Sequence, residues 1–554
     1  MWITTNLNYF CKMSVNHYDY IVIGSGFGGS VAAMRLSEKG YKVLVIEKGK
    51  RWTSRDFPNS NWNVKKSLWV PWLRWFGILQ LKFFKKVFVL SGIGLGGGSL
   101  VYANVHMTPE EDFFTDPSWA RFGHWKDTLK PFYDRARFML GSTLYEKEYV
   151  EDLAFKEVAD EMGVGSSYRP VDAVGVYFGT SHEERDPYFN GLGPNRSPCK
   201  ECAGCMVGCK HNAKNTLDKN YLWFAENLFG TKIQTEELVY RIEPVISGGY
   251  QLTTHSSTSW IKTKKHYTAK GIICSAGVLG TMQLLFDQKL KFGTMPGISD
   301  QLGSDILTNC EMISGVTASP HRLNHGLAIS RIMKPDTNTF VELCKYPDHS
   351  GAMYKLAVMA AGEGSILMRI FKMFYAAITH PLDWIRSMLQ WNVARHSIIF
   401  LVMQRLPGSL KMNAQMAWGR VRLSLGSTTG SQIPVFIKQG QEALLRYAKK
   451  VKGVPQNAAT EVLFGMSTTA HLMGGCPMGK EVSEGVIGVN GQLLGYPDFY
   501  VLDASVIQAN LGVNPSLTIV AWSEYVMDLI PVKDGFDMQS LERRINSQKE
   551  KPDS

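Results

Sequence analysis

Residues 20–40 decide the fold of this chain, and they read YIVIGSGFGGSVAAMRLSEKG. A short apolar strand leads into a glycine-rich turn, and the turn leads into a helix. A second apolar strand, residues 42–46, ends on Glu47, about 20 residues after the first glycine, where a dinucleotide-binding unit carries its ribose-binding acid. The turn offers four glycines to the phosphates of such a ligand: Gly24, Gly26, Gly28 and Gly29. The alternative is a glycine turn that joins strand to helix and binds nothing.

The last third of the chain carries the residues that indicate chemistry. His471 opens the stretch HLMGGCPMG, in which an imidazole stands beside glycines that allow a flat ligand to approach. The stretch GVNPSLTI begins at Gly512 and predicts a helix, with Asn514 as its N-cap and Pro515 at its first position. A helix N-terminus stabilises an anion that forms beside it, and a base near such an end suits removal of a hydride from an alcohol. The alternative for His471 is a purely structural histidine.

A third glycine-rich stretch, SGIGLGGGSLVYAN, spans residues 91–104. The three stretches, in this order, resemble the glucose-methanol-choline (GMC) flavoprotein oxidoreductases, and within them the cholesterol oxidase-like branch, over roughly residues 19–530. The resemblance implies non-covalently bound FAD rather than NAD, with the isoalloxazine ring under the C-terminal stretches. Besides the first turn, Glu47 and Pro515, it assigns these residues to the cofactor site: Gly97, Gly98, Ser99, Asn104, Val239, Ala276, Gly277 and Asp503. For Val239, Ala276 and Gly277 the alternative is ordinary central sheet.

The residue types suggest a mechanism. His471 would take the hydroxyl proton while a hydride leaves the carbinol carbon for the flavin, and Asn514 would orient the alcohol and the flavin edge. The helix that begins at Pro515 would stabilise the anionic reduced flavin. Glu342 lies in the stretch FVELCKYP, which resembles the segment that bears the double-bond-moving carboxylate in cholesterol oxidases. Burial would raise the pKa of Glu342, as a residue that takes and returns a proton requires. The alternative is that Glu342 has no catalytic role and is simply paired or solvated.

Four of the nine cysteines fall in one short stretch: Cys199, Cys202, Cys205 and Cys209. Their spacing matches that of a bacterial-type iron–sulfur site, except that Lys210 stands where proline is usual. It also resembles family relatives whose flavin subunit carries such a cluster. A structural zinc site and free thiols are the alternatives. Disulfides are disfavoured because the other five cysteines are scattered singly, which indicates a reducing compartment.

Composition and charge exclude several classes of protein. With 45% hydrophobic and 20% charged residues and no uncharged apolar run of ~18 residues, the chain is neither disordered nor membrane-spanning. The net charge of +11 is spread along the chain without a recognition motif, so we expect no nucleic-acid partner. The first 17 residues lack the features of a secretory signal, which favours a cytoplasmic protein, and translation could begin at Met1 or Met13.

Two stretches rich in aromatic residues indicate a lipid-like substrate. Residues 64–86 mix lysines and arginines with tryptophans and phenylalanines, which is typical of a segment at a membrane surface. Residues 353–391 are rich in Met, Phe and Ile, which suits a pocket or lid for a large apolar ligand, with ordinary core helices as the alternative. We therefore expect a lipid-like alcohol as substrate and a peripheral membrane contact.

The fold class that we expect is α/β: a Rossmann-like, discontinuous FAD-binding domain with an α+β substrate domain built on an antiparallel sheet. We assign residues 18–140, 199–299 and 455–530 to the FAD-binding domain, residues 141–198 to a connecting cover segment, and residues 301–454 to the substrate domain. Alternating apolar residues at 338–343 and 397–402 predict strands of the antiparallel sheet. The tail, residues 531–554, is polar and is expected to be loose.

Three functions are compatible with these features. The first is FAD-dependent oxidation of the hydroxyl of a cholesterol-like 3-hydroxysteroid to the ketone, with oxygen as the acceptor and with or without double-bond isomerisation. The second is a sterol or long-chain alcohol dehydrogenase that passes electrons through an iron–sulfur cluster to a quinone or carrier. The third is a non-catalytic lipid-binding flavoprotein.

Overall fold

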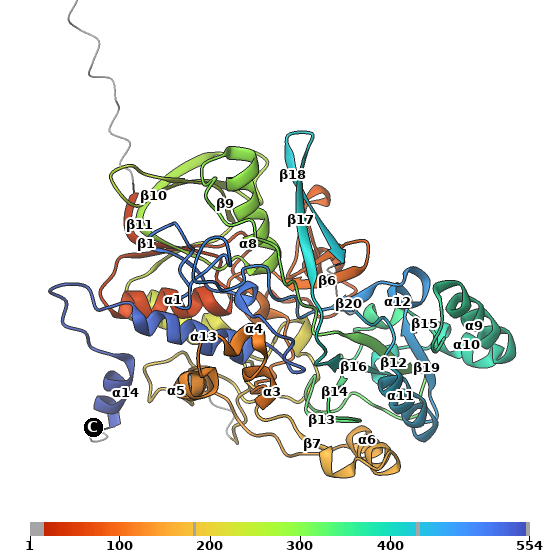
Figure 1. Cartoon of the computed structure of the whole chain (residues 1–554). Coiled ribbons are helices and arrows are strands. Elements are labelled where there is room, and N and C mark those ends of the chain that lie inside the picture. Colours follow the sequence, from red (N-terminus) through yellow and green to blue (C-terminus); the bar gives the residue numbers. More distant parts are fainter. Residues whose placement is uncertain (1–15, 181–183, 428–432, 550–554) are drawn as a thin grey trace, which may run out of the picture.

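Strand β1 (Asn16–Ile23) lies inside the first sheet of the computed structural model, which describes residues 16–180, 184–427 and 433–549 (Figure 1). It pairs in parallel with β2 (Val43–Ile46) on one side and with β11 (Lys264–Cys274) on the other. Helix α1 (Phe27–Glu38) follows the glycine turn directly. The strand–turn–helix order predicted from residues 20–40 is confirmed. The two candidate start positions lie outside the described residues.

The rest of the first sheet places the ends of several parallel strands at one edge. Its further strands are β8 (Lys232–Gln234), β21 (Phe499–Val501), β10 (Tyr250–Ser256) and β9 (Glu237–Pro244), in the order β8-β2-β1-β11-β10-β9, with β21 also on β11. The strands β1, β2, β8, β11 and β21 run parallel, so the glycine turn lies at their carboxyl edge, where α/β sheets bind ligands. Helices α7 (Tyr221–Asn227) and α13 (Ser516–Leu529) pack against α1, and α5 (Trp125–Met139) packs against α13.

Two close contacts hold the N-terminal unit against the C-terminal segment. A Cβ on Gly28 would lie 1.8 Å from the carbonyl oxygen of Leu502, so only glycine allows α1 to approach this backbone. Arg35 on α1 is buried and donates from Nε (2.8 Å) and Nη2 (3.0 Å) to the carboxylate of Glu524 on α13. Residues almost 500 positions apart therefore form one body.

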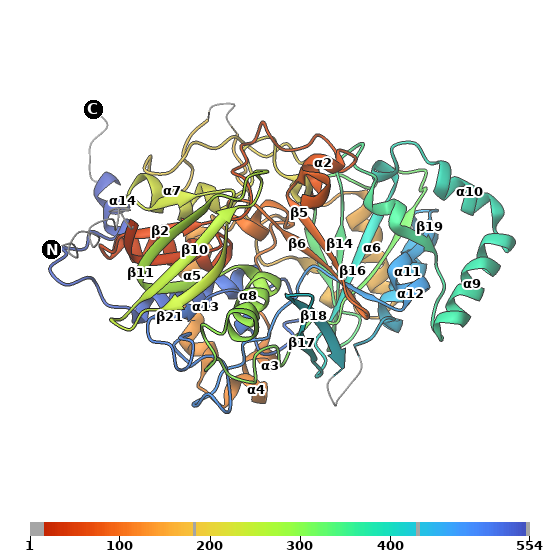
Figure 2. The same ribbon diagram turned by 90° about the horizontal axis from the view of Figure 1, so that it is seen from above.

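The second sheet is antiparallel and lies beside the first (Figure 2). Its strands are β15 (Ala357–Met359), β19 (Val454–Ala458), β12 (Met312–Thr317), β16 (Ile398–Gln404), β14 (Thr339–Cys344), β13 (Arg331–Met333) and β7 (Arg169–Pro170), in that order. The strands predicted at 338–343 and 397–402 are confirmed as β14 and β16, and they are neighbours. Helices α6 (Val150–Glu161) and α11 (Lys438–Lys450) share a hydrophobic core with this sheet.

Smaller elements connect and surround the two sheets. Strand β6 (Val87–Gly92) pairs with β5 (Leu79–Phe83) and, in parallel, with β20 (Ser467–Thr469), while β17 (Leu410–Ala417) and β18 (Arg420–Ser427) form a separate hairpin. The remaining α-helices and β-strands are α2 (Val64–Ser67), β3 (Trp69–Val70), β4 (Trp75–Phe76), α3 (Glu111–Phe114), α4 (Pro117–Ala120), α8 (Gly277–Phe286), α9 (Ile366–Thr379), α10 (Pro381–Leu389), α12 (Ala459–Phe464) and α14 (Leu541–Lys549). Strand β20, which precedes His471, pairs with β6, and β6 lies between the two sheets (Figure 2).

The stretch of residues 353–391 does not form core helices. It contains α9 and α10, on which Arg369 and Ser387 are the buried residues, whereas the large apolar side chains are mostly exposed. The alternative of ordinary core helices is therefore wrong. In the described ranges, no helix is both long enough and apolar enough to cross a membrane.

Residues 64–86 divide their rings between the core and the surface. Trp69 and Phe76 pack on Ile93 in a small buried cluster, whereas Trp72 is exposed. The buried rings are explained by this packing, so only part of the stretch is available to a membrane. Its predicted role at a membrane surface stays a prediction.

The expectation of a loose tail is wrong for residues 541–548. They belong to α14, whose first residue, Leu541, is fully buried in the main hydrophobic core. The backbone N–H of Leu541 donates to Oε1 of Glu38 (2.6 Å), and Glu542 pairs with Arg35 at 3.3 Å. The polar composition of the tail concealed two apolar anchors, Leu541 and Ile545.

We expect Arg35→Ala to destabilise the protein by about 3–5 kcal/mol, because it leaves the buried carboxylate of Glu524 without its main partner. Chemical denaturation monitored by circular dichroism measures this change. The control is Arg446→Ala, which removes an exposed pair with Glu442 and should cost less than about 1 kcal/mol. Equal effects of the two substitutions would contradict the role given to Arg35.

Candidate active site

Two glycine loops meet where the dinucleotide was predicted. A Cβ on Gly97 would lie 2.8 Å from the Cα of Gly26, so the loop of residues 96–99 packs on the first turn. Gly24 has φ +94°, and a Cβ there would lie 2.2 Å from the carbonyl oxygen of Ser275. At Gly26 a Cβ would meet nothing within 4 Å. The loops therefore form a cradle that is closed by backbone on one side and open at Gly26.

Glu47 shapes this cradle from the end of β2. Its Oε2 accepts hydrogen bonds from the backbone N–H (3.1 Å) and hydroxyl (2.7 Å) of Ser25, and its Oε1 accepts from the N–H of Gly49 (2.8 Å). The carboxylate thus holds the glycine turn in place through Ser25. Its predicted contact with a ribose stays a prediction.

The other predicted cofactor residues lie on the segments around the cradle. Ser99 is buried and accepts from the N–H of Leu217 (3.1 Å), while Asp503 accepts from the N–H of Ser505 (2.8 Å) and from the hydroxyl of Thr281 (2.5 Å). Gly98 follows Gly97 in the second loop, Ala276 and Gly277 begin α8, and Val239 is buried in β9.

The buried amide of Asn104 indicates that a cofactor fits beside the glycine loops. The residue is fully buried with φ 69°, and neither its amide oxygen nor its amide nitrogen has a partner among the described residues. A buried amide left unpaired is costly, so such a group indicates a missing ligand. Together with the open face at Gly26, it fits a bound dinucleotide such as FAD.

Four polar side chains come together from distant parts of the chain. His471 follows β20, Glu342 lies in β14, Asn514 precedes α13, and Glu311 precedes β12. Nδ1 of His471 is hydrogen-bonded to Oε1 of Glu311, whose Oε2 accepts from the N–H of Ala470 (3.0 Å). Nδ2 of Asn514 donates to Oε2 of Glu342 (3.3 Å). The structure thus brings the three predicted catalytic residues into one cluster, in which Glu342 and Asn514 are buried and His471 is partly exposed.

Glu311 is the member of this cluster that the sequence analysis missed. It is fully buried, and it stands directly before the apolar strand β12. The sequence signal for Glu311 is a single acid at the start of an apolar strand. That signal does not identify His471 as its partner. The pairing with His471 depends on the fold.

The protonation of the cluster follows from burial and from neighbouring charges. Burial by itself lowers the pKa of His471, but the charge of Glu311 and its hydrogen bond outweigh this, so the pKa lies above its ordinary value. Burial raises the pKa of Glu342 to about 7, against the smaller opposing effects of Asn514 and His471. Oε1 of Glu342 and Oδ1 of Asn514 have no partner in the described part of the chain. Two acceptor atoms are therefore available to a ligand.

The predicted start of the C-terminal helix is wrong by one residue. Helix α13 begins at Ser516, with Pro515 rather than Asn514 at the N-cap position. The side chain of Asn514 does not cap the helix, because it turns to Glu342 instead. The helix still begins two residues after Asn514, so its N-terminus remains at the cluster.

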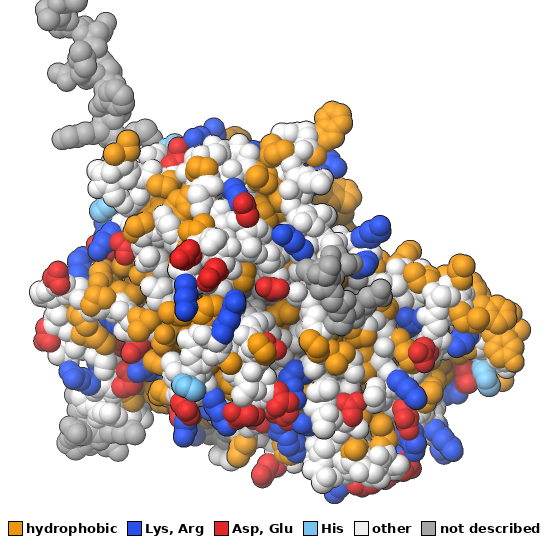
Figure 3. Space-filling view, viewed as in Figure 1, with side chains coloured by type: hydrophobic (Ala, Val, Ile, Leu, Met, Phe, Trp, Pro, Cys, Tyr) orange, Lys and Arg blue, Asp and Glu red, His pale blue; other side chains and the backbone are white. Residues whose placement is uncertain are grey.

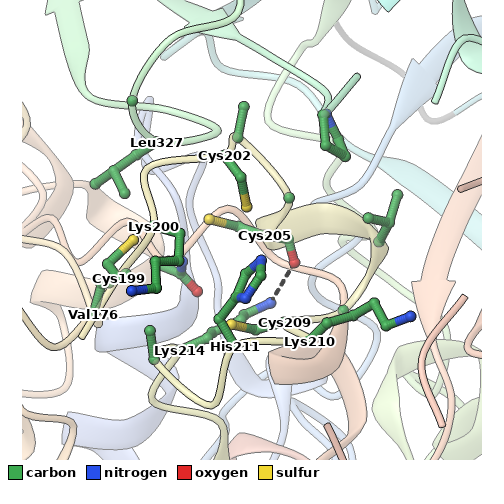
Figure 4. A pocket seen from close by; sticks show the side chains of 18 of the residues that line it. Val176, Cys199, Lys200, Cys202, Cys205, Cys209, Lys210, His211, Lys214 and Leu327 are labelled. Carbon is green, nitrogen blue, oxygen red and sulfur yellow. Dashed lines mark hydrogen bonds between the residues drawn. The ribbon is translucent and has the colours of Figure 1, made fainter. Parts of the chain in front are cut away.

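The four clustered cysteines line a pocket beside the cradle (Figure 4). Asn104 and Lys214 line the same pocket. Nζ of Lys214 donates to the carbonyl oxygens of Leu100 (3.0 Å), Tyr102 (2.8 Å) and Cys205 (2.8 Å), and burial lowers its pKa to about 7. Lys214 therefore ties the cysteine segment to the second glycine loop.

The geometry of this pocket does not fit a metal centre. Within the residues that the structure describes, no three His, Cys, Asp or Glu side chains are placed to hold one metal ion. Cys199, Cys202, Cys205 and Cys209 are free thiols. The described residues therefore give no structural support for an iron–sulfur cluster or a zinc ion.

The fold and the site define an FAD-dependent alcohol oxidoreductase: a dinucleotide cradle on a parallel sheet, next to a histidine with a buried carboxylate partner. Comparisons with known proteins agree. A family model described as GMC oxidoreductase matches residues 428–523, and one described as NAD(P)-binding Rossmann-like domain matches residues 22–65. A cholesterol oxidase of Acinetobacter baumannii is 39% identical over 549 residues, which cover 96% of this chain and 98% of that protein. The chain therefore belongs to the GMC oxidoreductase family, in its cholesterol oxidase-like branch.

Further relatives support the same placement. A cholesterol oxidase of Mycobacterium tuberculosis (strain H37Rv) is 38% identical over 536 residues, covering 94% of this chain and 92% of that protein. A long-chain-alcohol oxidase of Arabidopsis thaliana is 22% identical, covering 91% of this chain and 66% of that protein. The solved structure of a pyridoxine 4-oxidase from Mesorbium loti has a TM-score of 0.59 at 15% identity, covering 92% of this chain and 98% of that one, which shows a shared fold.

We expect Gly26→Val to fold normally but to lose bound flavin. Gly26 has φ −70°, which any residue adopts, and its Cβ direction is free of protein atoms, so only a bound ligand would clash with the new side chain. The ratio of flavin absorbance to protein, together with thermal melting of the apoprotein, checks this. Gly28→Val is the contrasting variant. It should not fold, because its side chain would clash with the backbone carbonyl of Leu502. Full flavin content in Gly26→Val would show that the cofactor lies elsewhere.

Proposed function

We propose that the protein oxidises the 3-hydroxyl of a cholesterol-like sterol to the ketone and that oxygen is the electron acceptor. The observation that carries this proposal is the pairing of His471 with the buried carboxylate of Glu311, beside Glu342 and Asn514. The names of the relatives that are 38–39% identical to the chain support the sterol as substrate. The absence of a fitting metal site among the described residues speaks against a dehydrogenase that uses a cluster and a quinone or carrier.

His471 is the proton acceptor in this proposal. Glu311 accepts the hydrogen bond of Nδ1–H, so Nε2 carries the lone pair in the neutral ring and can take the proton of the substrate hydroxyl. Bound FAD supplies the hydride acceptor. Asn514 orients the alcohol and the flavin edge. Its Oδ1, which the described chain leaves unpaired, is an acceptor for a hydrogen other than the hydroxyl proton that His471 takes. The N-terminus of α13 contributes positive potential near the same place.

Glu342 is suited to move a double bond after oxidation. A ketone next to a carbon–carbon double bond isomerises when a base removes the proton from the carbon between them and returns it to the far carbon of the double bond. Glu342 is fully buried with a pKa of about 7, so it both takes and gives a proton near neutral pH. Its Oε1 has no partner in the described ranges, which leaves this atom for the transfer.

We also propose that the protein is cytoplasmic and contacts a membrane peripherally. Eight described cysteines, Cys199 to Cys476, are free thiols, which supports a reducing compartment such as the cytoplasm. A sterol dissolves in bilayers rather than in water, so the enzyme would meet its substrate by peripheral contact with a membrane.

We expect His471→Gln to lower the rate of sterol oxidation by at least about 100-fold, because glutamine cannot take the hydroxyl proton. Peroxidase-coupled detection of hydrogen peroxide with detergent-solubilised cholesterol measures this rate. Flavin content and the melting temperature should match the wild type. A variant that keeps the full rate would rule out the proposed base.

Glu342→Gln should oxidise the sterol at a similar rate but release the unconjugated ketone, because the amide cannot shuttle the proton. Chromatography of the products, with the ultraviolet absorbance of the conjugated enone, measures the outcome. In the wild type, conjugation requires the ionised carboxylate, so it should weaken as the pH falls below about 7. Conjugated product from Glu342→Gln at the wild-type rate would assign the step to another residue.

A further inference from the structure

Helices α9 and α10 carry large apolar side chains on the surface of the molecule. Six of the residues on or just after them are at least 65% exposed: Leu367, Phe371, Ile378, Leu382, Leu389 and Trp391. In Figure 3 hydrophobic side chains cover the right-hand tip of the molecule, where Figure 1 places the two helices. We call this surface the α9–α10 face.

The orientation of α9 is the reverse of that of an ordinary surface helix. Its inner side is formed by Met373, Ala376 and Ala377, which pack on Met359 and neighbouring buried residues. The larger side chains point outward, whereas a surface helix normally turns its apolar stripe to the core. Soluble monomers rarely expose a contiguous apolar surface of this kind unless it binds something.

Hydrogen bonds anchor both helices to the second sheet and its connections. Nη1 of Arg369 donates to the carbonyl oxygen of Glu461 (3.1 Å), and Nη2 of Arg386 donates to that of Ala318 (2.8 Å). Nζ of Lys355 donates to the carbonyl oxygen of Met388 (2.7 Å) at the end of α10. The outward rings therefore belong to a docked pair of helices, and they are held in place as a surface.

The charges around the face identify the kind of partner that fits. Residues 366–396 contain four Lys or Arg and one acid, Asp383, and the cations at Lys372, Arg386 and Arg395 are exposed. Apolar and aromatic side chains edged by cations match a bilayer with anionic headgroups. A second copy of the same face would oppose these cations with like charges, which disfavours self-association.

We propose that the α9–α10 face inserts into the headgroup region of an anionic lipid bilayer, which would let the enzyme take its substrate from the membrane. The role of the bilayer as substrate source rests on the proposed sterol oxidation. The start of α9 contacts the segment that leads to His471: Cδ1 of Ile366 is 2.8 Å from where a Cβ on Gly465 would be, and Gly465 lies six residues before His471. The docked helix pair is therefore in contact with the segment that carries the catalytic histidine.

The test is sedimentation of the FAD-loaded protein with vesicles of phosphatidylcholine and phosphatidylglycerol. The wild type should bind, and the double variant Leu367→Gln/Phe371→Gln should bind at least about tenfold more weakly, because two large apolar side chains no longer leave water on binding. The matched control is Leu144→Gln/Ile246→Gln, which removes two exposed apolar side chains elsewhere and should bind as the wild type does. Melting temperatures verify that each variant is folded.

Two further measurements keep the outcome unambiguous. Oxidation of cholesterol in detergent micelles should be unchanged in Leu367→Gln/Phe371→Gln, while oxidation of cholesterol in vesicles should fall with binding. The proposed docking surface would be contradicted if the wild type does not bind vesicles, or if the double variant binds them as well as the control does. A wild-type dimer in lipid-free buffer that this variant makes monomeric would also overturn it in favour of a second copy. Lack of sterol oxidation in micelles would refute the proposed function alone, because vesicle binding is measured separately.

Discussion

The architecture depends on the close approach of the first glycine turn to backbone from the other end of the chain. Gly28 leaves no room for a side chain against Leu502, and Gly97 leaves little against Gly26. Glycine at these points lets three distant segments share one edge of the parallel sheet. The buried pair of Arg35 and Glu524 then holds α1 and α13 together, so α13 keeps its N-terminus beside the cradle.

The reactive cluster uses this arrangement to bury polar groups at limited cost. Glu311 and Glu342 are fully buried, and each has a specific partner in His471 or Asn514. A buried carboxylate is costly unless it is paired or protonated, and the two acids meet this requirement in different ways. Glu311 is paired with a histidine whose pKa is raised, whereas Glu342 has a pKa near neutrality. One acid therefore positions the base, and the other remains able to exchange a proton.

The sequence predicted features that depend on local pattern and could not predict features that depend on long-range packing. The strand, turn and helix of residues 20–40 follow from apolar runs and glycines, and the structure confirms them. Glu311 escaped notice because its partner is 160 positions away along the chain. The exposure of Phe371 was equally hidden, since an apolar helix suits a core as well as a membrane surface. The four cysteines of residues 199–209 have the spacing of an iron–sulfur site, but among the described residues they do not form a metal site. Spacing along the chain does not determine how the loop orients the four thiols.

The most direct test of the account is the pH dependence of anaerobic flavin reduction by cholesterol in the wild type and in Glu311→Gln. Glu311 raises the pKa of His471, and the base must be neutral to accept the hydroxyl proton. The wild-type rate should therefore rise with pH through a midpoint above the ordinary histidine value, and Glu311→Gln should shift this midpoint to lower pH. An identical midpoint in both proteins would contradict the central claim that the Glu311–His471 pair sets the proton transfer.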